Sequence, residues 1–329
     1  MPTNVRLGLI GCGRHGRGNL IPAIQRHSNA QLIACADMDG SSAQKTAMDL
    51  GIDDYYADYH QMLNDCLVDA LVIAVPHAMI LPVALDAIQA GVHLFVEKPM
   101  ALNAKDAQRI IDASAEKQVK VMVGYCQRYA AARMRMKQLL AQGVVGDVDL
   151  VIAGKGSAPL TGWLAGAPEQ GGGQLLFLGV HLTDQILWML NDYPQSVTGE
   201  VQFHTNGYDE TSSIVMRFPK DILVNMSLSM NTAGGFDFIE FFGSKGRIRA
   251  DWPSNMLQVH SDTIKAYQQP TTIRVEGNNS MMYGAQMQAF VEAVAQGSDM
   301  PIPAENGLQV LQVIDAVFES NKLHRSVSL

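Results

Sequence analysis

Long apolar runs, basic clusters and paired cysteines are all missing from this sequence, and each absence excludes a class of function. No apolar run in the 329 residues approaches the ~20 residues that a membrane-spanning helix needs. Lys and Arg number 24 against 32 Asp and Glu, a net charge of −8 that argues against a nucleic-acid-binding surface. The segment Met1–Asn4 lacks the basic-then-apolar layout of a secretory signal. We therefore expect no membrane and no nucleic acid as partner.

Cysteine is scarce, and its spacing indicates no metal site. The four cysteines are Cys12, Cys35, Cys66 and Cys126, and no two of them have the paired spacing of a zinc site. Cys12 and Cys35 fall in or beside apolar segments, where a free cysteine behaves as a small hydrophobe. We expect no bound metal and a reducing, cytoplasmic environment.

The overall composition is that of an ordinary globular protein. Hydrophobic residues make up 47% and charged residues 17% of the chain. A single core rarely grows beyond ~250–300 residues, so a chain of this length is expected to form two domains.

A glycine-rich turn follows the first apolar segment. Residues 5–10 are apolar except for Arg6 and Gly8, and they lead into Gly11-Cys12-Gly13-Arg14-His15-Gly16 and then a helical stretch to about Arg26. In a G-x-G-x-x-G turn the glycines allow a tight turn, close backbone approach to a pyrophosphate and close packing of helix on strand. The pyrophosphate would lie at the helix N-terminus, where free amides and the helix dipole favour an anion.

Asp37 supports a dinucleotide site. It ends a second apolar segment, 31–36, and follows Gly16 by 21 residues, close to the ~20 expected for the carboxylate that holds the adenosine ribose hydroxyls. A carboxylate there repels a 2′-phosphate, which favours NAD over NADP. Arg14 and Lys45 are near enough in sequence to weaken that preference, so NADP stays an alternative. A tight turn without a ligand would leave the spacing of Asp37 unexplained.

Strands and helices alternate as far as Gly124. Further strands are expected at 69–75, 91–97 and 119–124, and helices at 41–50, 59–65, 79–89 and 104–117. This alternation predicts a parallel, doubly wound α/β sheet.

Two of these strands end in chemically useful residues. One is followed by Pro76-His77 and another by Glu97-Lys98-Pro99, where proline ends the ladder. Ligands of open α/β sheets bind outside the carboxyl ends of the strands, so these side chains are expected to face a ligand. The alternatives are a helix cap for His77 and a surface ion pair for Glu97 and Lys98.

The pattern changes in the second half. From about Val148 the apolar period falls from 3.6 towards 2, and strands are expected at 148–153, 197–206, 212–218, 222–230 and 236–242. Because no helices separate most of them, the sheet is expected to be open and mainly antiparallel. We expect a Rossmann domain at 1–124 and an α+β domain at 125–329, with helices near 282–296 and 305–321 that pack back on the first domain.

Apolar residues alternate along the expected sheet of the second domain. Examples are Val215, Phe218, Val224, Met226, Leu228 and Met230. One face of this sheet is expected to cover the catalytic cleft or helices. The other face is expected to pair with a second subunit, giving a homodimer or homotetramer with an interface above ~1,000 Å².

Together these motifs resemble those of the glucose–fructose oxidoreductase, inositol dehydrogenase and rhizopine-catabolism (Gfo/Idh/MocA) oxidoreductases, over essentially the whole chain. The residues that carry the resemblance are Gly11-Cys12-Gly13-Arg14-His15-Gly16, Glu97-Lys98-Pro99, Gly124-Tyr125-Cys126-Gln127-Arg128-Tyr129, Gly171-Gly172-Gly173, Gly179-Val180-His181-Leu182-Thr183-Asp184 and Gly243-Ser244-Lys245-Gly246. The resemblance implies an NAD(P)-binding domain followed by an open sheet that often forms the oligomer interface. It also implies hydride transfer at a hydroxyl or carbonyl of a sugar, cyclitol or sugar derivative.

The resemblance assigns roles to particular residues. The catalytic lysine and histidine of the family fall on Lys98 and His181. An imidazole can take the proton of the reacting alcohol, and an ammonium group can stabilise the developing alkoxide. The residues implied to bind cofactor are Gly11, Gly13, Arg14, His15, Gly16, Asp37, Pro76, His77, Glu97, Lys98 and Gln127. Those implied to contact substrate are Lys98, Tyr125, Phe177 and His181. The alternative for His181 is an ordinary buried histidine on an apolar helix.

The sequence departs from the family at two positions. Phe177 stands four residues before His181, where the family commonly has an aspartate, and Ile80 replaces a frequent histidine. Without that carboxylate His181 lacks its usual orienting partner. Asp184 shares a helix face with His181 and could substitute or merely anchor the helix, and Tyr125 or Tyr129 could contribute a hydroxyl. The main expectation is therefore a sugar or polyol dehydrogenase, with a non-catalytic NAD(P)- and sugar-binding sensor as alternative and NAD-dependent glycoside cleavage as a narrower one.

Overall fold

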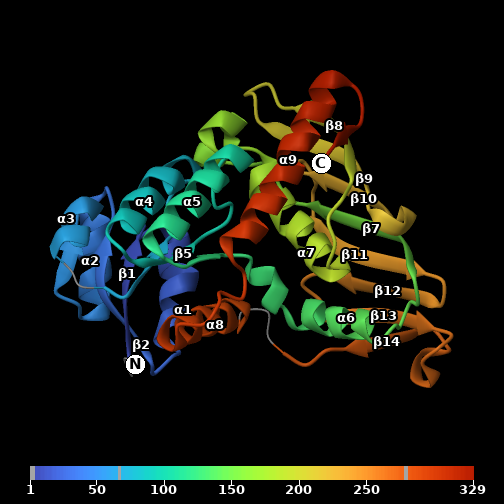
Figure 1. Cartoon of the computed structure of the whole chain (residues 1–329), viewed down its shortest axis with the longest axis horizontal. Coiled ribbons are helices and arrows are strands. Elements are labelled where there is room, and N and C mark those ends of the chain that lie inside the picture. Colours follow the sequence, from blue (N-terminus) through green and yellow to red (C-terminus); the bar gives the residue numbers. More distant parts are fainter. Residues whose placement is uncertain (1–3, 66–67, 278–280) are drawn as a thin grey trace. The chain divides into compact units, whose positions relative to one another are not determined.

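The chain forms two compact units. The computed structural model describes all residues except 1–3, 66–67 and 278–280. Unit 1 spans Met1–Cys126 and Ser280–Leu308, and unit 2 spans Gln127–Asn279 and Gln309–Leu329. Each unit is built around its own sheet (Figure 1).

Unit 1 contains a six-stranded sheet in the order β3-β2-β1-β4-β5-β6, and every strand pair in it is parallel. The strands are β1 (Val5–Ile10), β2 (Ala30–Ala36), β3 (Asp54–Tyr56), β4 (Ala70–Ile73), β5 (His93–Val96) and β6 (Val121–Val123). The predicted doubly wound sheet is confirmed. The strand order reverses between β1 and β4, which is where open α/β sheets bind their ligands.

The helices of unit 1 follow the predicted alternation. They are α1 (Ile21–Gln25), α2 (Gly40–Leu50), α3 (Tyr59–Asp65), α4 (His77–Gln89), α5 (Ala104–Lys117) and α8 (Met282–Gln296). Local side chains cap two of them: the Asp39 carboxylate accepts from the Ser41 amide at the start of α2, and the Asn103 side chain accepts from the Asp106 amide at the start of α5. Such caps satisfy amides that have no partner inside the helix.

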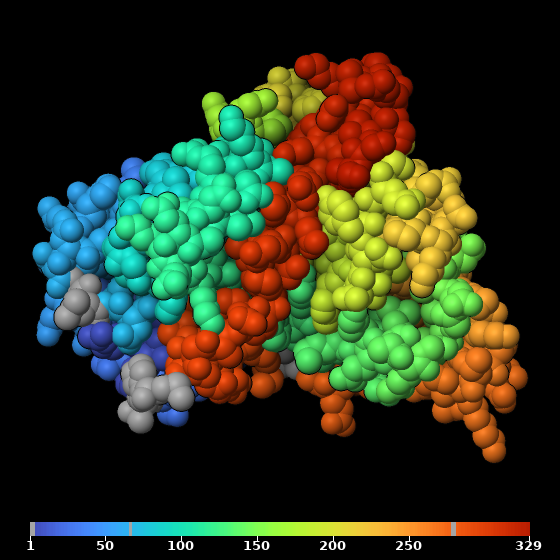
Figure 2. Space-filling view, in the orientation of Figure 1, coloured from blue at the N-terminus to red at the C-terminus, as the bar shows by residue number. Residues whose placement is uncertain are grey.

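Helix α8 belongs to unit 1 although it lies far along the chain. It packs beside α1, and Phe290 from α8 meets Phe95 of β5 edge-to-face with ring centroids 5.6 Å apart. In Figure 2 its orange-red surface adjoins the blue and cyan surface of the N-terminal segments. Among the described residues, no helix is both long and apolar enough to cross a membrane.

Unit 2 contains a nine-stranded sheet in the order β14-β13-β12-β11-β7-β10-β9-β8-β15. The strands are β7 (Val148–Gly156), β8 (Ser196–Phe203), β9 (Asp209–Arg217), β10 (Leu223–Ser229), β11 (Phe236–Gly243), β12 (Gly246–Asp251), β13 (Met256–Ser261), β14 (Thr271–Arg274) and β15 (Val327–Ser328). Only the β7–β10 pair is parallel, so the expected mainly antiparallel sheet is confirmed. The strands β12 to β15 were not anticipated from the sequence.

Helices cover one face of this sheet. They include α6 (Ala131–Ala141), which packs on β12 and β13, and α7 (Val180–Leu190), which packs on β7. Helix α9 (Ala304–Leu323) begins in the last segment of unit 1 and continues in unit 2. On the covered face Val224, Met226 and Leu228 are buried as expected. Val215 lies on the other face: its side chain alternates with buried Ile214 and Met216 and is 43% exposed.

Candidate active site

The glycine-rich turn after β1 leaves one backbone position open. A Cβ on Gly11, whose φ is +103°, would lie 2.3 Å from the Ala74 carbonyl oxygen, and a Cβ on Gly16 would lie 2.3 Å from the Gly11 carbonyl oxygen. Both glycines are therefore required by the fold. A Cβ on Gly13 would meet no protein atom within 4 Å. Gly13 thus has the open backbone that close approach of a pyrophosphate requires.

Asp37 is tied to the same turn. One of its carboxylate oxygens accepts a hydrogen bond of 2.8 Å from the Cys12 amide, and the other accepts one of 2.9 Å from the Asp39 amide. A carboxylate offers about four lone-pair sites, so acceptor capacity remains for ribose hydroxyls. The turn and Asp37 therefore fit a dinucleotide, and the residues that would hold it are adjacent.

Glu97 and His15 meet in unit 1 although they come from different motifs. The Glu97 carboxylate accepts from the Lys98 amide at 3.2 Å, and its other oxygen lies 3.0 Å from His15 Nε2. Gly124 makes this position possible, because a Cβ there would lie 3.0 Å from Glu97 atoms. The structure thus brings together the glycine-rich turn and the carboxyl end of β5.

Tyr283 lies beside His15 and Glu97 in unit 1, and it was not identified from the sequence. Its ring lies edge-on to His15, with centroids 5.6 Å apart, and burial raises the pKa of its hydroxyl well above the usual range. Tyr283 comes from α8, which is distant in sequence, and no local pattern marks it.

The remaining residues predicted in unit 1 follow the carboxyl ends of its strands. Pro76 is the N-cap of α4 and His77 is the first residue of that helix, which begins four residues after the end of β4. Lys98 follows β5, and Tyr125, which is fully buried, follows β6. Ile80 is also fully buried in α4, in agreement with a packing role.

His181 lies in the first turn of α7 in unit 2. A π-helical turn, Leu175–Gly179, precedes it, and a second π-helical turn, Gly16–Leu20, follows the glycine-rich turn in unit 1. Such turns are rare and frequently occur at functional sites. The His181 side chain is buried, and its carbonyl oxygen accepts a hydrogen bond of 2.9 Å from Gln185 Nε2.

Asp209 anchors the turn that leads to His181. Its carboxylate accepts a hydrogen bond of 2.7 Å from the Leu175 amide and is fully buried. A Cβ on Gly173, whose φ is +93°, would lie 1.8 Å from Asp209 Oδ1, which explains the glycine. Burial raises the pKa of Asp209 to about 7, although the backbone amides of Leu175 and Gln174 act in the opposite direction.

Asp184 anchors α7. Its carboxylate accepts three hydrogen bonds from the Arg128 guanidinium, of 3.1 Å, 2.9 Å and 2.6 Å. Burial raises the pKa of Asp184, while Arg128 opposes that shift. Both oxygens of Asp184 are thus engaged by Arg128. This favours the interpretation that Asp184 anchors the helix over the one in which it orients His181. Burial raises the pKa of Tyr129 to about 12, so its hydroxyl keeps its proton.

Phe177 lies in an apolar cluster. It packs against a buried cluster of Leu160, Leu178, Tyr208 and Met230, against which Leu164 and Ala165 also pack. These residues come from the loop after β7, from the π-helical turn and from the ends of β9 and β10. An aspartate at this position would face apolar groups, so the departure from the family motif agrees with its surroundings.

Lys155 and Asp237 form a buried ion pair that sequence reasoning missed. They lie opposite each other on β7 and β11, and Lys155 also donates to Gln127 Oε1 at 3.1 Å. A signal was present: strand alternation puts Lys155 in line with buried Val151 and Ala153. A lysine at such a position is rarely buried unless paired.

The predicted site residues are divided between the two units. Every residue expected to bind cofactor lies in unit 1 except Gln127, whereas Gln127, Phe177 and His181 lie in unit 2. Of the cysteines, Cys12, Cys35 and Cys126 are free and buried, and Cys66 lies outside the described residues. Within the described part of the chain, no group of three or more His, Cys, Asp or Glu side chains could hold a metal ion.

Comparison with known proteins agrees with this division. Residues 5–125 match the family model described as "Oxidoreductase family, NAD-binding Rossmann fold", and residues 134–249 match the "GFO/IDH/MocA C-terminal domain". Inositol 2-dehydrogenase of Rhizobium meliloti (strain 1021) is 25% identical over 336 residues, which cover 99% of each chain. Trans-1,2-dihydrobenzene-1,2-diol dehydrogenase of Xenopus laevis is 29% identical over 60% of this chain and 59% of that protein.

Solved structures share the fold over nearly the whole chain. Levoglucosan dehydrogenase, in complex with NADH and L-sorbose, has a TM-score of 0.91 at 19% identity and covers 99% of each chain. Aldose-aldose oxidoreductase of Caulobacter crescentus, complexed with glycerol, has a TM-score of 0.90 at 19% identity and covers 99% of this chain and 100% of that chain.

Replacing Asp209 by Asn should change how stability depends on pH. The pKa of about 7 in the folded state lies above the ~3.9 of an unfolded chain, so the folded state holds more protons between these values. The contribution of Asp209 to stability therefore falls as pH rises from about 4 to about 7. Relative to wild type, the free energy of unfolding of Asp209→Asn should rise by up to about 4 kcal/mol across that window.

Urea unfolding at a series of pH values measures this effect. Asp221→Asn, which alters a carboxylate whose side chain is 95% exposed in the same unit, is the control and should show no such trend. A difference between Asp209→Asn and wild type that does not vary with pH would contradict the assignment.

Proposed function

Because the chain belongs to the Gfo/Idh/MocA family of NAD-binding oxidoreductases, we propose that it transfers a hydride between nicotinamide and a hydroxyl or carbonyl carbon of a sugar, cyclitol or sugar derivative. One observation carries the proposal: Lys98 is the second residue after β5, and His181 lies in the first turn of α7 behind an anchored π-helical turn. The alternative, a non-catalytic sensor, was raised because Phe177 stands where the family commonly has the aspartate that orients the histidine. The curated relatives that match over most of this chain include two named as inositol dehydrogenases, which favours an enzyme.

The cofactor-binding role is proposed for the residues of unit 1. Gly13 leaves room for a pyrophosphate, and Asp37 has acceptor capacity for ribose hydroxyls. Bound NAD would supply the hydride acceptor. The Asp37 carboxylate, held by the Cys12 and Asp39 amides, would repel a 2′-phosphate, which supports a preference for NAD over NADP.

The chemistry at the substrate is proposed for Lys98 and His181. Oxidation of an alcohol leaves an oxygen that must lose its proton, and the His181 imidazole is the group proposed to accept it. The Lys98 ammonium stabilises negative charge on the same oxygen. Glu97, which accepts from the Lys98 amide and contacts His15, positions the segment that carries Lys98.

The substrate is proposed to be a ring with neighbouring hydroxyls. The names of the relatives include an inositol dehydrogenase and a dihydrobenzenediol dehydrogenase. The apolar cluster around Phe177 supports a substrate with one less polar edge. The free, buried thiols of Cys12, Cys35 and Cys126 support a reducing, cytoplasmic location.

NADH should bind more tightly than NADPH. Asp37→Ala should weaken NADH binding by about tenfold or more, because a hydrogen bond to a charged group contributes ~1.5–3 kcal/mol, and should reduce the difference between the two cofactors. Fluorescence titrations of both cofactors measure this. Asp53→Asn, at an exposed carboxylate of the same unit, should leave both affinities unchanged. Tighter binding of NADPH by the wild type would refute the preference.

His181→Ala and Lys98→Ala should each lower turnover by ~10²–10⁴-fold with little effect on NADH affinity. The substrate comes from a screen of sugars, cyclitols and cyclic diols followed at the NADH absorbance band. His60→Ala, at an exposed histidine, is the control. Undiminished turnover of His181→Ala would show that the proton leaves by another route.

We also propose that the protein forms a homodimer or homotetramer through the face of the unit 2 sheet that helices do not cover. On β7 and β11 this face carries half-buried Leu150, Ile152, Phe238 and Phe242, whereas on β10 it is polar at Asn225 and Ser227. Ile152→Lys should therefore give a monomer, and Ser227→Lys should not. Light scattering at micromolar concentration measures the mass, and a monomeric wild type would refute the proposal.

A further inference from the structure

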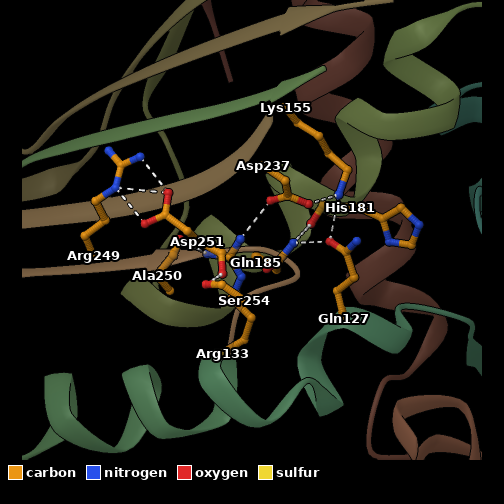
Figure 3. Close-up of polar contacts among 10 residues, drawn as sticks. All are labelled: Gln127, Arg133, Lys155, His181, Gln185, Asp237, Arg249, Ala250, Asp251 and Ser254. Carbon is orange, nitrogen blue, oxygen red and sulfur yellow. Dashed lines mark hydrogen bonds and ion pairs between the residues drawn. The ribbon is translucent and has the colours of Figure 1, made fainter. Parts of the chain in front are cut away.

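A buried charge network lies on the helix-covered face of the unit 2 sheet (Figure 3). Asp237 on β11 accepts hydrogen bonds from Lys155 on β7 and, at 2.8 Å, from Arg133 on α6. Arg133 also donates to the Ala250 carbonyl oxygen at 3.2 Å. All three ionised side chains are more than nine-tenths buried. Each charge therefore has a hydrogen-bonded partner of opposite sign, which is the condition for burying it.

The network reaches Gln127 and determines the orientation of its amide. Gln127 Oε1 accepts hydrogen bonds from Lys155 Nζ at 3.1 Å and from Gln185 Nε2 at 2.7 Å. A lysine ammonium can only donate, so the amide oxygen and not the nitrogen must face Lys155. The NH₂ group of Gln127 is consequently turned away from the network. Among the described residues no acceptor is found for it.

Gln127 is also connected to the segment that carries His181. Gln185 Nε2, which donates to Gln127, donates with its second hydrogen to the His181 carbonyl oxygen at 2.9 Å. Gln127 therefore belongs to the same hydrogen-bonded group as the proposed base. The other residues proposed to bind cofactor lie in unit 1.

Packing of the sheet does not require a charged side chain at Lys155. Lys155 is in line with Val151 and Ala153 on the buried face of β7, where an apolar side chain would pack without a desolvation penalty. Replacing a buried ion pair by apolar residues is often neutral or stabilising. A polar network at this place is thus better explained by the orientation that it imposes on Gln127.

We propose that Gln127 is a substrate-binding residue whose NH₂ group donates a hydrogen bond to a hydroxyl or carbonyl oxygen of the substrate, and that Lys155 and Gln185 are the residues that position it. This inference rests on the proposed function, and it moves Gln127 from the cofactor to the substrate. Because Gln127 offers only a donor here, the substrate must present an acceptor oxygen. An analogue that lacks this oxygen is rejected, since the buried donor is then unpaired.

Gln127→Glu tests the donor directly. A glutamate can still accept from Lys155 and Gln185 but has no N–H to donate. We expect kcat/KM for the best substrate of the screen to fall at least about tenfold, with the dissociation constant of NADH changed less than about twofold. The wild type should discriminate against the deoxy analogue that lacks the recognised oxygen, and the variant should not. Gln202→Glu, the same change at an exposed position of β8, should match the wild type.

Two further variants separate orientation from structure. Gln127→Met keeps the side-chain volume without adding a charge and should show the same loss in kcat/KM. Lys155→Met leaves Asp237 paired with Arg133 but frees the Gln127 amide to rotate, so it should also lower kcat/KM. Combined with Gln127→Glu it should cause no further loss of discrimination, because both changes act on one hydrogen bond.

The outcomes distinguish this inference from the proposed function. An active wild type with unchanged kcat/KM and discrimination in Gln127→Glu and Gln127→Met would overturn the inference and leave the function intact. A loss confined to NADH affinity would return Gln127 to the cofactor. A wild type that turns over no member of the substrate panel would overturn the proposed function, and the inference with it.

Discussion

A carboxylate that accepts a hydrogen bond from a backbone amide holds each of the three turns on which the proposed chemistry depends. Asp37 holds the Cys12 amide, Glu97 holds the Lys98 amide, and Asp209 holds the Leu175 amide. The Cys12 amide lies between Gly11 and Gly13, and the Lys98 amide belongs to the proposed catalytic lysine. The Leu175 amide begins the π-helical turn that precedes His181. A carboxylate is the strongest acceptor available to a backbone N–H, so a short, glycine-rich turn can be held without a packed core of its own. The close approach of these carboxylates also requires glycine at two positions. A Cβ on Gly173 would overlap Asp209, and one on Gly124 would crowd Glu97.

Buried charge in unit 2 serves a different purpose. Asp184 with Arg128, and Asp237 with Lys155 and Arg133, remove ionised groups from water and give each a partner of opposite sign. Such pairs contribute little net stability because desolvation offsets most of the attraction. Their geometry, however, is directional. The first pair fixes α7 and the second fixes the amide of Gln127, and both act within the unit that carries His181.

The apolar surroundings of Phe177 bear on specificity. Where relatives of the family commonly have an aspartate, this chain has an aromatic side chain packed with Leu160, Tyr208 and Met230. Phe177 and these neighbours form one apolar surface. Together with the donor proposed at Gln127, this surface is the basis for proposing a substrate that is hydroxylated on one side and less polar on the other.

The sequence alone determined whatever depends on near neighbours in the chain. Apolar periods predicted both sheets, and the spacing from Gly16 to Asp37 predicted a dinucleotide turn, because strands, helices and tight turns are governed by interactions over a few residues. Only the tertiary structure decided which residues distant in sequence form hydrogen bonds and which strands lie side by side. Asp209 meets Leu175 across 34 residues, Lys155 meets Gln127 across 28, and the strands beyond Gly246 join a sheet whose order no local pattern specifies. A buried hydrogen bond between distant residues forms only when the backbone around both is already placed, so its partners are properties of the fold and not of any one segment.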